Sequence, residues 1–480
     1  MVARDSRFDG VFFVAVSTTG IYCRPICSAR TPGRDRVRFF RTPAEAEGQG
    51  YRACFRCRPE LAPGQAPLDS IPRLVARATR AIDEGYLNER SVDDLAFSLG
   101  VTGRHLRRAM EAEIGVTPVE LAQSRRLALA KQLLHDSRAG LAEIAFASGF
   151  QSVRRFNTLF RERFGRTPSS VRHEHGTRRA APGEREPLTL RLGYRPPFDW
   201  ASLLEFLHRR AVPGVEGAGD GEYRRTVFLD GHAGVITVAH DPRRSALLAT
   251  VSPSLAGSLM AIAARLRALF DLDAHPASIS QAFARDPVLG PLVARRPGLR
   301  VAGSFEPFEA AVRAILGQQV TVRAATTLAG RFAARFGSPL AAADGAGAAL
   351  THLFPAPERI GRATVDEIAS LGIVGARARA ILALARNVCD GTLKLDRSAP
   401  VDDTLRALED LPGVGAWTAQ YVAMRTLRWP DAFPASDIAV RKALGGVTAR
   451  EAERRSEPWR PWRSYAVLHL WTSLGDPAEP

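Results

Sequence analysis

The sequence predicts a multidomain α+β protein whose 480 residues form four folded regions in succession. Three observations support this fold class. Four of the five cysteines stand in one short N-terminal stretch, a helical pattern then repeats itself, and a strand-rich stretch precedes a long helical one rich in Ala and Leu. We therefore expect a small metal-binding domain, an all-α domain, a small antiparallel β domain and a second all-α domain.

The clustered cysteines predict a metal site. They follow the pattern Cys-x3-Cys and then Cys-x2-Cys, and they are Cys23, Cys27, Cys54 and Cys57. Thiolate pairs at such spacing are typical of a tetrahedral zinc site, with each pair supplied by one turn. Two disulfides are the alternative, but Met1 to Gly10 is charged and carries no secretory signal. We expect one zinc ion in a cytoplasmic protein.

Basic side chains crowd the cysteine pairs, and the whole chain has a formal net charge of +16. The arginines concerned are Arg24, Arg30, Arg34, Arg36, Arg38, Arg52, Arg56 and Arg58. A purely structural zinc site does not need so many cations, whereas a site that meets a phosphate backbone does. No stretch approaches the roughly 18 apolar residues that would span a membrane. DNA is the expected partner, and a membrane is not.

Two segments around the cysteines carry a family resemblance. They are Thr18-Thr19-Gly20-Ile21-Tyr22-Cys23-Arg24-Pro25-Ile26-Cys27 and Tyr51-Arg52-Ala53-Cys54-Phe55-Arg56-Cys57. Residues 1–66 resemble the N-terminal domain of the bacterial adaptive-response regulators, the Ada family. The resemblance implies that the four cysteines bind zinc and that Cys23 accepts a methyl group from a methylphosphotriester in DNA. A zinc-bound sulfur stays deprotonated and nucleophilic at neutral pH.

The chemistry of that transfer suggests a switch. Methylation removes one negative charge from the four-thiolate zinc site, so the face that meets DNA becomes less repulsive and affinity should rise. The thioether that forms is stable. We therefore expect a sensor of methylated DNA that reacts once, rather than a catalyst that turns over at this site.

A helical pattern repeats within residues 70–175. The segment that starts at Asp94 resembles the one at Glu143, and the Gly-x-Thr-Pro motif at Gly115 recurs at Gly165. An offset of about 50 residues predicts two copies of one supersecondary unit.

Each copy shows the signals of a helix-turn-helix. Ser91 is expected to cap a helix, Gly100 and Gly149 suit left-handed turns, and Thr102 and Ser152 are expected to cap the second helices. The polar faces of these second helices carry Arg104, Arg107, Arg108, Arg154, Arg155 and Asn157. Such side chains suit contacts in the major groove of DNA, although a single Arg-rich face is often only solvated.

The two units together resemble the DNA-binding domain of AraC-type regulators, which also follows the zinc domain in the Ada family. The resemblance implies binding to promoter DNA, with RNA polymerase as a further partner. Residues 176–187 lack periodicity and predict a linker. Strand signals then fill residues 188–258, where Asp230-Gly231 separates two apolar runs and predicts a hairpin turn. Residues 259–480 are expected to be helical.

The segment Leu411–Tyr421 predicts a tight turn between two apolar helices. A proline and two glycines form the turn, and the backbone N–H groups of Gly413, Val414 and Gly415 are expected to point outward and hold a phosphate oxygen. An ordinary interhelical turn is the alternative.

Further motifs extend this pattern. They are Ala314-Ile315-Leu316-Gly317-Gln318-Gln319-Val320, Phe433-Pro434-Ala435-Ser436-Asp437-Ile438-Ala439-Val440, Trp459-Arg460-Pro461-Trp462-Arg463-Ser464-Tyr465-Ala466, and Trp471. With the turn, they make residues 188–475 resemble the helix-hairpin-helix DNA glycosylases, closely the AlkA-type 3-methyladenine glycosylase II. The resemblance implies that Asp437 is catalytic and that Tyr421, Trp471 and Trp417 line the base pocket. A helix N-cap is the alternative role of Asp437.

The implied chemistry is excision of alkylated purines. A purine alkylated at N3 or N7 is cationic and leaves readily, so one carboxylate suffices to stabilise the sugar cation and orient water. Electron-rich rings attract such a base once it is flipped out. Strand-cutting relatives carry a lysine where Trp417 stands, so a monofunctional glycosylase is expected. Gln319 stands where the AlkA type has a bulky apolar wedge.

Two absences narrow the function further. Cys389 is the only cysteine of the C-terminal half, which excludes the iron–sulfur cluster of some relatives. The Pro-Cys-His-Arg motif of the second Ada methyltransferase is absent, so repair of O6-methylguanine is not expected. We predict a monomeric fusion of sensor, regulator and glycosylase. Two alternatives stay open, a transcription factor whose glycosylase half only binds DNA, and a repair enzyme whose N-terminal half is only a DNA tether.

Overall fold

The computed structural model divides the chain into two compact units. Unit 1 consists of Met1–Pro196 and Leu229–Arg267, and unit 2 consists of Pro197–Phe228 and Ala268–Pro480. The structure describes residues 4–64, 73–174, 187–341, 349–396 and 399–475. Except for Pro187, the predicted linker over residues 176–187 lies outside the described residues. No helix in these described ranges is long and apolar enough to cross a bilayer.

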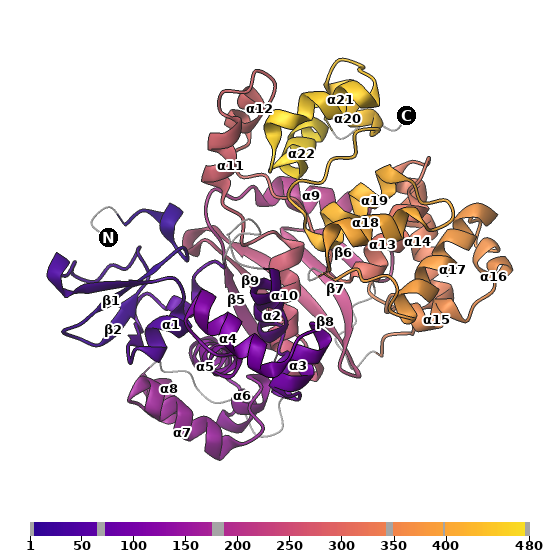
Figure 1. Ribbon diagram of the computed structural model, residues 1–480. Coiled ribbons are helices and arrows are strands. Elements are labelled where there is room, and N and C mark those ends of the chain that lie inside the picture. Colours follow the sequence, from indigo (N-terminus) through magenta and orange to yellow (C-terminus); the bar gives the residue numbers. More distant parts are fainter. Residues whose placement is uncertain (1–3, 65–72, 175–186, 342–348, 397–398, 476–480) are drawn as a thin grey trace. The chain divides into compact units, whose positions relative to one another are not determined.

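The N-terminal part of unit 1 is a four-stranded sheet with the strand order β3-β1-β2-β4. Its central strands β1 and β2 are labelled in Figure 1. Its elements are β1 (Phe13–Val16), β2 (Ile21–Cys23), β3 (Val37–Phe40), β4 (Arg52–Ala53) and the helix α1 (Pro43–Gly48). Strand β1 pairs antiparallel with β2 and β3, whereas β2 pairs parallel with β4. Because β2 and β4 are parallel neighbours, the two cysteine pairs at their C-terminal ends meet at one edge of the sheet.

The helical part of unit 1 contains the two predicted helix-turn-helix units. Its helices are α2 (Arg73–Asp83), α3 (Val92–Ser98), α4 (Gly103–Ile114), α5 (Pro118–Asp136), α6 (Leu141–Ala147), α7 (Val153–Phe164) and α8 (Pro168–Glu174). The predicted caps are confirmed, since Ser91, Thr102 and Ser152 accept backbone N–H bonds at the starts of α3, α4 and α7. The predicted turns are confirmed by φ values of 76° at Gly100 and 85° at Gly149.

The strands that follow are divided between the two units. Unit 1 holds β5 (Leu188–Gly193), β8 (His232–Asp241) and β9 (Ala246–Val251), and β9 pairs antiparallel with both others. Unit 2 holds the antiparallel pair β6 (Glu216–Gly219) and β7 (Glu222–Leu229). The predicted turn at Asp230-Gly231 is confirmed, because it separates β7 from β8 with φ values of 50° and 79°.

One helix was not expected in the strand-rich stretch. Helix α9 (Trp200–Arg210) starts at Asp199, whose side chain accepts the Ser202 N–H. Its buried residues are Trp200, Leu203 and Leu207, a helical spacing that the sequence already contained. Burial of this apolar face explains why the segment is a helix.

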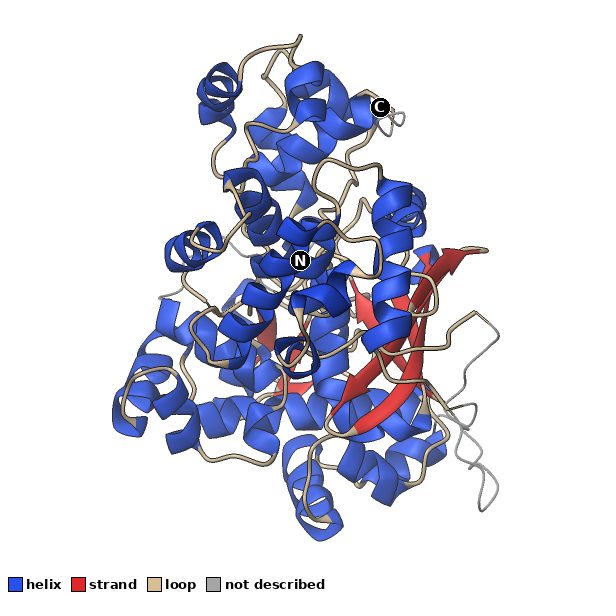
Figure 2. Cartoon of the chain, turned by 90° about the vertical axis from the view of Figure 1, so that its right-hand side faces the viewer, coloured by secondary structure: helices blue, strands red, loops and turns tan. Residues whose placement is uncertain are grey.

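The remainder of unit 2 is helical, and in Figure 2 the strands, in red, take up only a small part of the chain. The helices after α9 and α10 (Leu259–Leu269) are α11 (Pro276–Phe283), α12 (Leu289–Arg295), α13 (Pro307–Leu316), α14 (Val322–Phe336), α15 (Pro357–Gly361), α16 (Val365–Ala369), α17 (Gly375–Cys389), α18 (Val401–Glu409), α19 (Ala416–Val422), the π-helical turn η8 (Ala423–Leu427), α20 (Ile438–Ala443), α21 (Ala449–Ser456) and α22 (Arg463–Ser473).

Two apolar cores hold unit 2 together. One gathers buried residues of α13, α14, α17 and α19. The other gathers residues of α11, α12, α20 and α22. Tyr421 of α19 packs against both cores. Tyr421, one of the residues expected to form the base pocket, therefore lies where the two cores meet.

Candidate metal site and candidate active site

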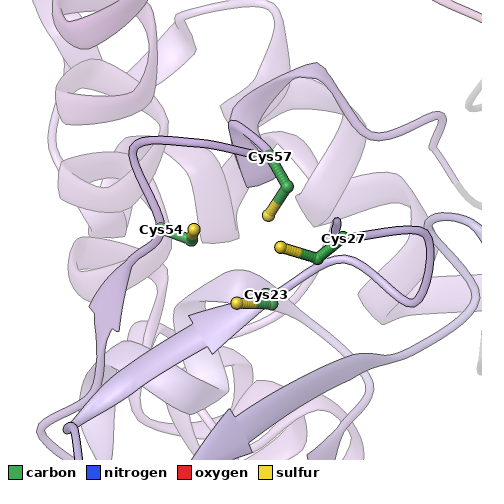
Figure 3. A group of neighbouring side chains, drawn as sticks. All are labelled: Cys23, Cys27, Cys54 and Cys57. Atoms are coloured by element: carbon green, nitrogen blue, oxygen red, sulfur yellow. The ribbon is translucent and has the colours of Figure 1, made fainter. Parts of the chain in front are cut away.

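The four clustered cysteines converge in unit 1. Figure 3 shows the side chains of Cys23, Cys27, Cys54 and Cys57 pointing toward one another, and their sulfur atoms all lie within 4.8 Å of each other. Zinc–sulfur bonds of about 2.3 Å in a tetrahedron place the sulfurs about 3.8 Å apart. The arrangement therefore fits one zinc ion held by four thiolates.

Nearby backbone and side-chain groups hold the cysteine turns. The Arg24 N–H lies 3.4 Å from the Cys57 sulfur, and the Ala29 N–H lies 3.5 Å from the Cys27 sulfur. The Arg24 guanidinium donates to the Cys57 carbonyl at 3.3 Å and pairs with Asp9. These contacts tie the two cysteine pairs together.

The crowding of thiols spreads their pKa values apart. A hydrogen bond with Cys23 holds the pKa of Cys54 well below its usual range. The hydrogen bond with Cys54 raises the pKa of Cys23, and the hydrogen bond with Cys23 raises the pKa of Cys57. Cys57 is also the most exposed member of the site, whereas Cys23 is only 6% exposed.

The two second helices present the side chains that the sequence singled out. Each helix buries one face, with Leu106 and Met110 of α4 and Phe156 and Phe160 of α7 fully buried. The exposed residues are Arg104, Arg107, Arg108, Arg154, Arg155 and Asn157. Arg107 lies within 3.7 Å of Asp93, and both side chains are exposed. The structure thus leaves both faces open to solvent, and their contacts with bases stay predictions.

In unit 2, the carboxylate of Asp437 is held by three donors. Its Oδ1 accepts the Val440 backbone N–H at 2.9 Å and the Trp471 indole N–H at 3.1 Å. Its Oδ2 accepts the Trp417 indole N–H at 2.9 Å. Asp437 is therefore the N-cap of α20 and also a neighbour of two predicted pocket residues. The N-cap role weighed from the sequence is confirmed, and the catalytic role stays a prediction.

The predicted pocket aromatics line one cavity of about 670 Å³, together with Asp437. Trp417 and Tyr421 lie one turn apart on α19 and stack, with ring centroids 5.4 Å apart and an interplanar angle of 11°. The Trp471 ring lies 6.4 Å from Tyr421 at an angle of 41°. The structure brings these residues of distant elements to the same wall.

Arg425 is a cavity residue that sequence reasoning missed. Its guanidinium donates to the Tyr421 hydroxyl at 2.8 Å. Burial alone would raise the pKa of Tyr421, but the positive charges of Arg425, Arg210 and Arg313 together outweigh burial, and the pKa is lowered. The only sequence signal was a cation inside the apolar run from Tyr421 to Leu427.

The turn between α18 and α19 is a tight hairpin, as predicted. Gly413 has a φ of 79°, and Gly415 is the N-cap of α19 without a side-chain cap. Gly413 and Gly415 are exposed. Val414 differs from the prediction, because its N–H donates to the Leu411 carbonyl at 3.1 Å and its side chain is 5% exposed. Its N–H therefore serves the turn itself.

The loop between α13 and α14 presents Gln319. This residue is exposed and has a left-handed φ of 52°. Its neighbour Gln318, which sequence reasoning did not single out, donates to the Gly413 carbonyl at 3.0 Å and to the Thr418 hydroxyl at 2.9 Å. These two hydrogen bonds of Gln318 fix the position of its neighbour Gln319, the candidate wedge, relative to the hairpin.

Four family models match successive parts of the chain. The metal binding domain of Ada matches residues 1–60, and a helix-turn-helix domain matches residues 95–174. The AlkA N-terminal domain matches residues 189–306, and the HhH-GPD superfamily base excision DNA repair protein matches residues 312–461. With the converging sulfurs, the first match identifies one zinc ion as the cofactor.

Relatives cover the chain fully or in part. The probable bifunctional transcriptional activator/DNA repair enzyme AlkA of Mycobacterium tuberculosis is 41% identical over 480 residues, 99% of this chain and 95% of its own. The DNA-3-methyladenine glycosylase 2 of Escherichia coli is 36% identical and covers 59% of this chain and 97% of its own. A solved 3-methyladenine DNA-glycosylase from Archaeoglobus fulgidus shares the fold, with a TM-score of 0.52, 22% identity, and coverage of 59% of this chain and 97% of its own. The full-length match shows that the chain belongs to the family of bifunctional transcriptional activator/DNA repair enzymes, in which an Ada-type zinc domain and a helix-turn-helix region precede an AlkA-type glycosylase.

Proposed function

We propose that unit 2 excises alkylated purines from double-stranded DNA by hydrolysis, as a monofunctional glycosylase. The observation that carries this proposal is the Asp437 carboxylate, which two indole N–H groups hold beside the stacked rings of a cavity. The name of the Escherichia coli relative, DNA-3-methyladenine glycosylase 2, supports 3-methyladenine as a substrate. We include 7-methylguanine because its ring is likewise cationic in DNA.

The reaction needs no strong acid. The bond between C1′ and the base nitrogen breaks with its electron pair moving to the base, which neutralises the cationic ring. The sugar becomes positively charged, and the Asp437 carboxylate stabilises it. A water oxygen then bonds to C1′, and its proton passes through Asp437 to solvent. Trp417 carries no amine, so no covalent bond to the sugar forms at this position.

The other predicted residues position the substrate. The aromatic rings of Trp417, Tyr421 and Trp471 attract a flipped, cationic base. The backbone N–H groups at Gly413 and Gly415 hold a phosphate. Gln319 fills the gap that the base leaves in the stack.

A base-release assay tests this function. The full chain incubated with methylated duplex should release free 3-methyladenine and 7-methylguanine and leave abasic, uncut strands. Chromatography detects the bases and a denaturing gel detects cuts. Absence of base release would refute a glycosylase, and strand cutting without added alkali would refute the monofunctional reaction.

We also propose that the N-terminal domain senses methylated DNA through Cys23. Zinc, when bound, keeps the sulfurs deprotonated. The Cys23 sulfur bonds to the methyl carbon while the bond between that carbon and the phosphotriester oxygen breaks, which leaves an ordinary phosphodiester anion. The match to the metal binding domain of Ada supports this role.

Peptide mapping after reaction with labelled methylphosphotriester DNA tests the acceptor. Cys23→Ala should block labelling yet leave base release intact. The higher exposure of Cys57 makes it the natural competitor. A label on Cys57 or Cys54 would show that Cys23 is not the acceptor.

The regulatory function completes the proposal. The exposed faces of α4 and α7 bind promoter DNA more tightly after methylation, and the monomeric protein then acts on RNA polymerase. We propose that these functions divide at the predicted boundaries, with domains over residues 1–66, 70–175, 188–258 and 259–480. The order of the four family matches supports this division.

A further inference from the structure

Arg425 is a buried cation at the glycosylase cavity without a carboxylate partner among the described residues. The residue is 9% exposed. Its two terminal nitrogens donate to neutral oxygens, the Tyr421 hydroxyl at 2.8 Å and the Gly303 carbonyl at 3.1 Å. Its Nε is buried without a hydrogen-bond partner. A buried charge that lacks an opposite charge is costly, and such groups are ordinarily paired.

Four other charged groups that line the cavity pair with one another. Arg313 lies 2.6 Å from Glu216 and 2.9 Å from Glu309. Arg225 lies 2.8 Å from Glu309. Two guanidinium groups and two carboxylates thus neutralise each other, and all four line the cavity with Arg425. The charge of Arg425 is left over.

This surplus charge polarises the aromatic wall. Trp417 donates its indole N–H to Asp437, while the stacked Tyr421 accepts from Arg425. A carboxylate therefore lies at the edge of one ring and a guanidinium at the edge of the other. Arg425 is also the largest of the three positive charges that lower the pKa of Tyr421, ahead of Arg210 and Arg313. A methylated purine matches the aromatic rings and Asp437, but it offers no anionic group to Arg425.

We propose that the cavity also takes alkylated purines whose substituent ends in a carboxylate, such as N7-carboxymethylguanine, with Arg425 as the specificity-determining residue. This inference rests on the proposed glycosylase function. The cationic ring of such a base faces the aromatic rings, and its carboxylate completes the charge and hydrogen bonding of Arg425. A cavity of about 670 Å³ is of the size that holds ligands larger than one methylated base.

The excision step is the same hydrolysis. The bond to C1′ breaks, the electron pair neutralises the purine ring, and water adds to the sugar. The released base keeps its carboxylate and leaves as an anion. No oxidant, reductant or further reactant is required.

The test compares two duplexes, one methylated and one carboxymethylated with diazoacetate, using the full chain and chromatography of the released bases. The wild type should release 7-methylguanine and N7-carboxymethylguanine. Arg425→Met should slow release of the carboxymethylated base by about tenfold or more relative to the methylated base, since a hydrogen bond to a charged group is lost. Arg425→Lys keeps the positive charge and should retain most of the relative rate.

Arg428→Met is the matched control. Arg428 is also buried, ends the same π-helical turn and pairs with Asp271, but it does not line the cavity. Its loss should affect stability and leave the ratio of the two release rates unchanged. An equal effect of Arg425→Met on both bases would show that Arg425 is only structural and would overturn the proposal.

The result with the wild type distinguishes failure of the carboxylate proposal from failure of the glycosylase function. Release of only the methylated base overturns the carboxylate proposal, whereas release of neither base refutes the glycosylase function itself. If Arg425→Met does not fold, inhibition of wild-type base release by free bases tests the carboxylate proposal instead. Free N7-carboxymethylguanine should inhibit release of 7-methylguanine about tenfold more strongly than free 7-methylguanine does, again by one charged hydrogen bond. Equal or weaker inhibition would overturn the proposal.

Discussion

The metal site of unit 1 and the cavity of unit 2 both hold negatively charged groups, but they hold them by different means. Four thiols lie within 4.8 Å of one another and need a cation to be stable as thiolates. The single Asp437 carboxylate is held by neutral N–H groups of Trp417, Trp471 and Val440. The first site therefore depends on its metal for its structure, whereas the second is built by the fold alone.

Removal of zinc should therefore have the largest effect and should act on one site only. Zinc binding contributes on the order of 10 kcal/mol to the folding of such small domains. A chelator should unfold the sheet of β1 to β4, detected by hydrogen exchange, while base release stays unchanged. A metal-free domain that remains folded with two disulfides would break the comparison.

Acid should weaken unit 2 through His469 of α22. Burial lowers the pKa of His469 to about 4, from an unfolded value of about 6.5. The folded state therefore favours neutral His469. The contribution of this residue to the free energy of unfolding is complete above pH 6.5 and is lost as the pH falls toward 4. The loss amounts to about 3 kcal/mol. His469→Gln should flatten this part of the unfolding profile.

Trp471→Phe should reveal the contribution of the indole N–H to the rate separately from that of the aromatic ring. The phenyl ring still packs in the cavity, but Asp437 loses one N–H bond of 3.1 Å. Base release should slow by about tenfold, the value of one hydrogen bond to a charged group. Binding to an abasic-site analogue should change little.

Trp459→Phe is the control for that variant. The Trp459 indole donates to Asp286 at 2.7 Å, and neither residue lines the cavity. Loss of this hydrogen bond should lower the melting temperature without slowing base release to the same extent. Equal rate losses for both variants would mean that the indole bond to Asp437 has no special role.

The same comparison explains what the sequence could predict. The spacing of Cys23, Cys27, Cys54 and Cys57 is local, because each pair lies in one turn, so the metal site was predictable from the chain alone. The caps at Ser91 and Thr102 are local too. Helix α9 had a local signal in its apolar spacing, but the surrounding strand pattern obscured it.

The missed residues depend on contacts between distant segments. Arg425 donates to Gly303, and Gln318 donates to Gly413, in both cases across a long stretch of chain. No pattern of neighbouring residues indicates such partners. The pairing of Trp417 and Trp471 with Asp437 is likewise a product of the fold, although the resemblance to a known family had placed all three in one pocket.

The most direct test of the account is the rate of base release by Asp437→Asn. The asparagine keeps the size and can still cap α20, but the charge opposite the sugar cation is gone. Release of 3-methyladenine and 7-methylguanine should fall about 100-fold or more, about 3 kcal/mol, while an abasic-site analogue still binds. Asp286→Asn is the matched control, since Asp286 also accepts a backbone N–H at the start of a helix, from Leu289 of α12, and an indole N–H, and it should keep a normal rate. Near-normal release by Asp437→Asn, or loss of analogue binding together with release, would contradict the catalytic role of Asp437.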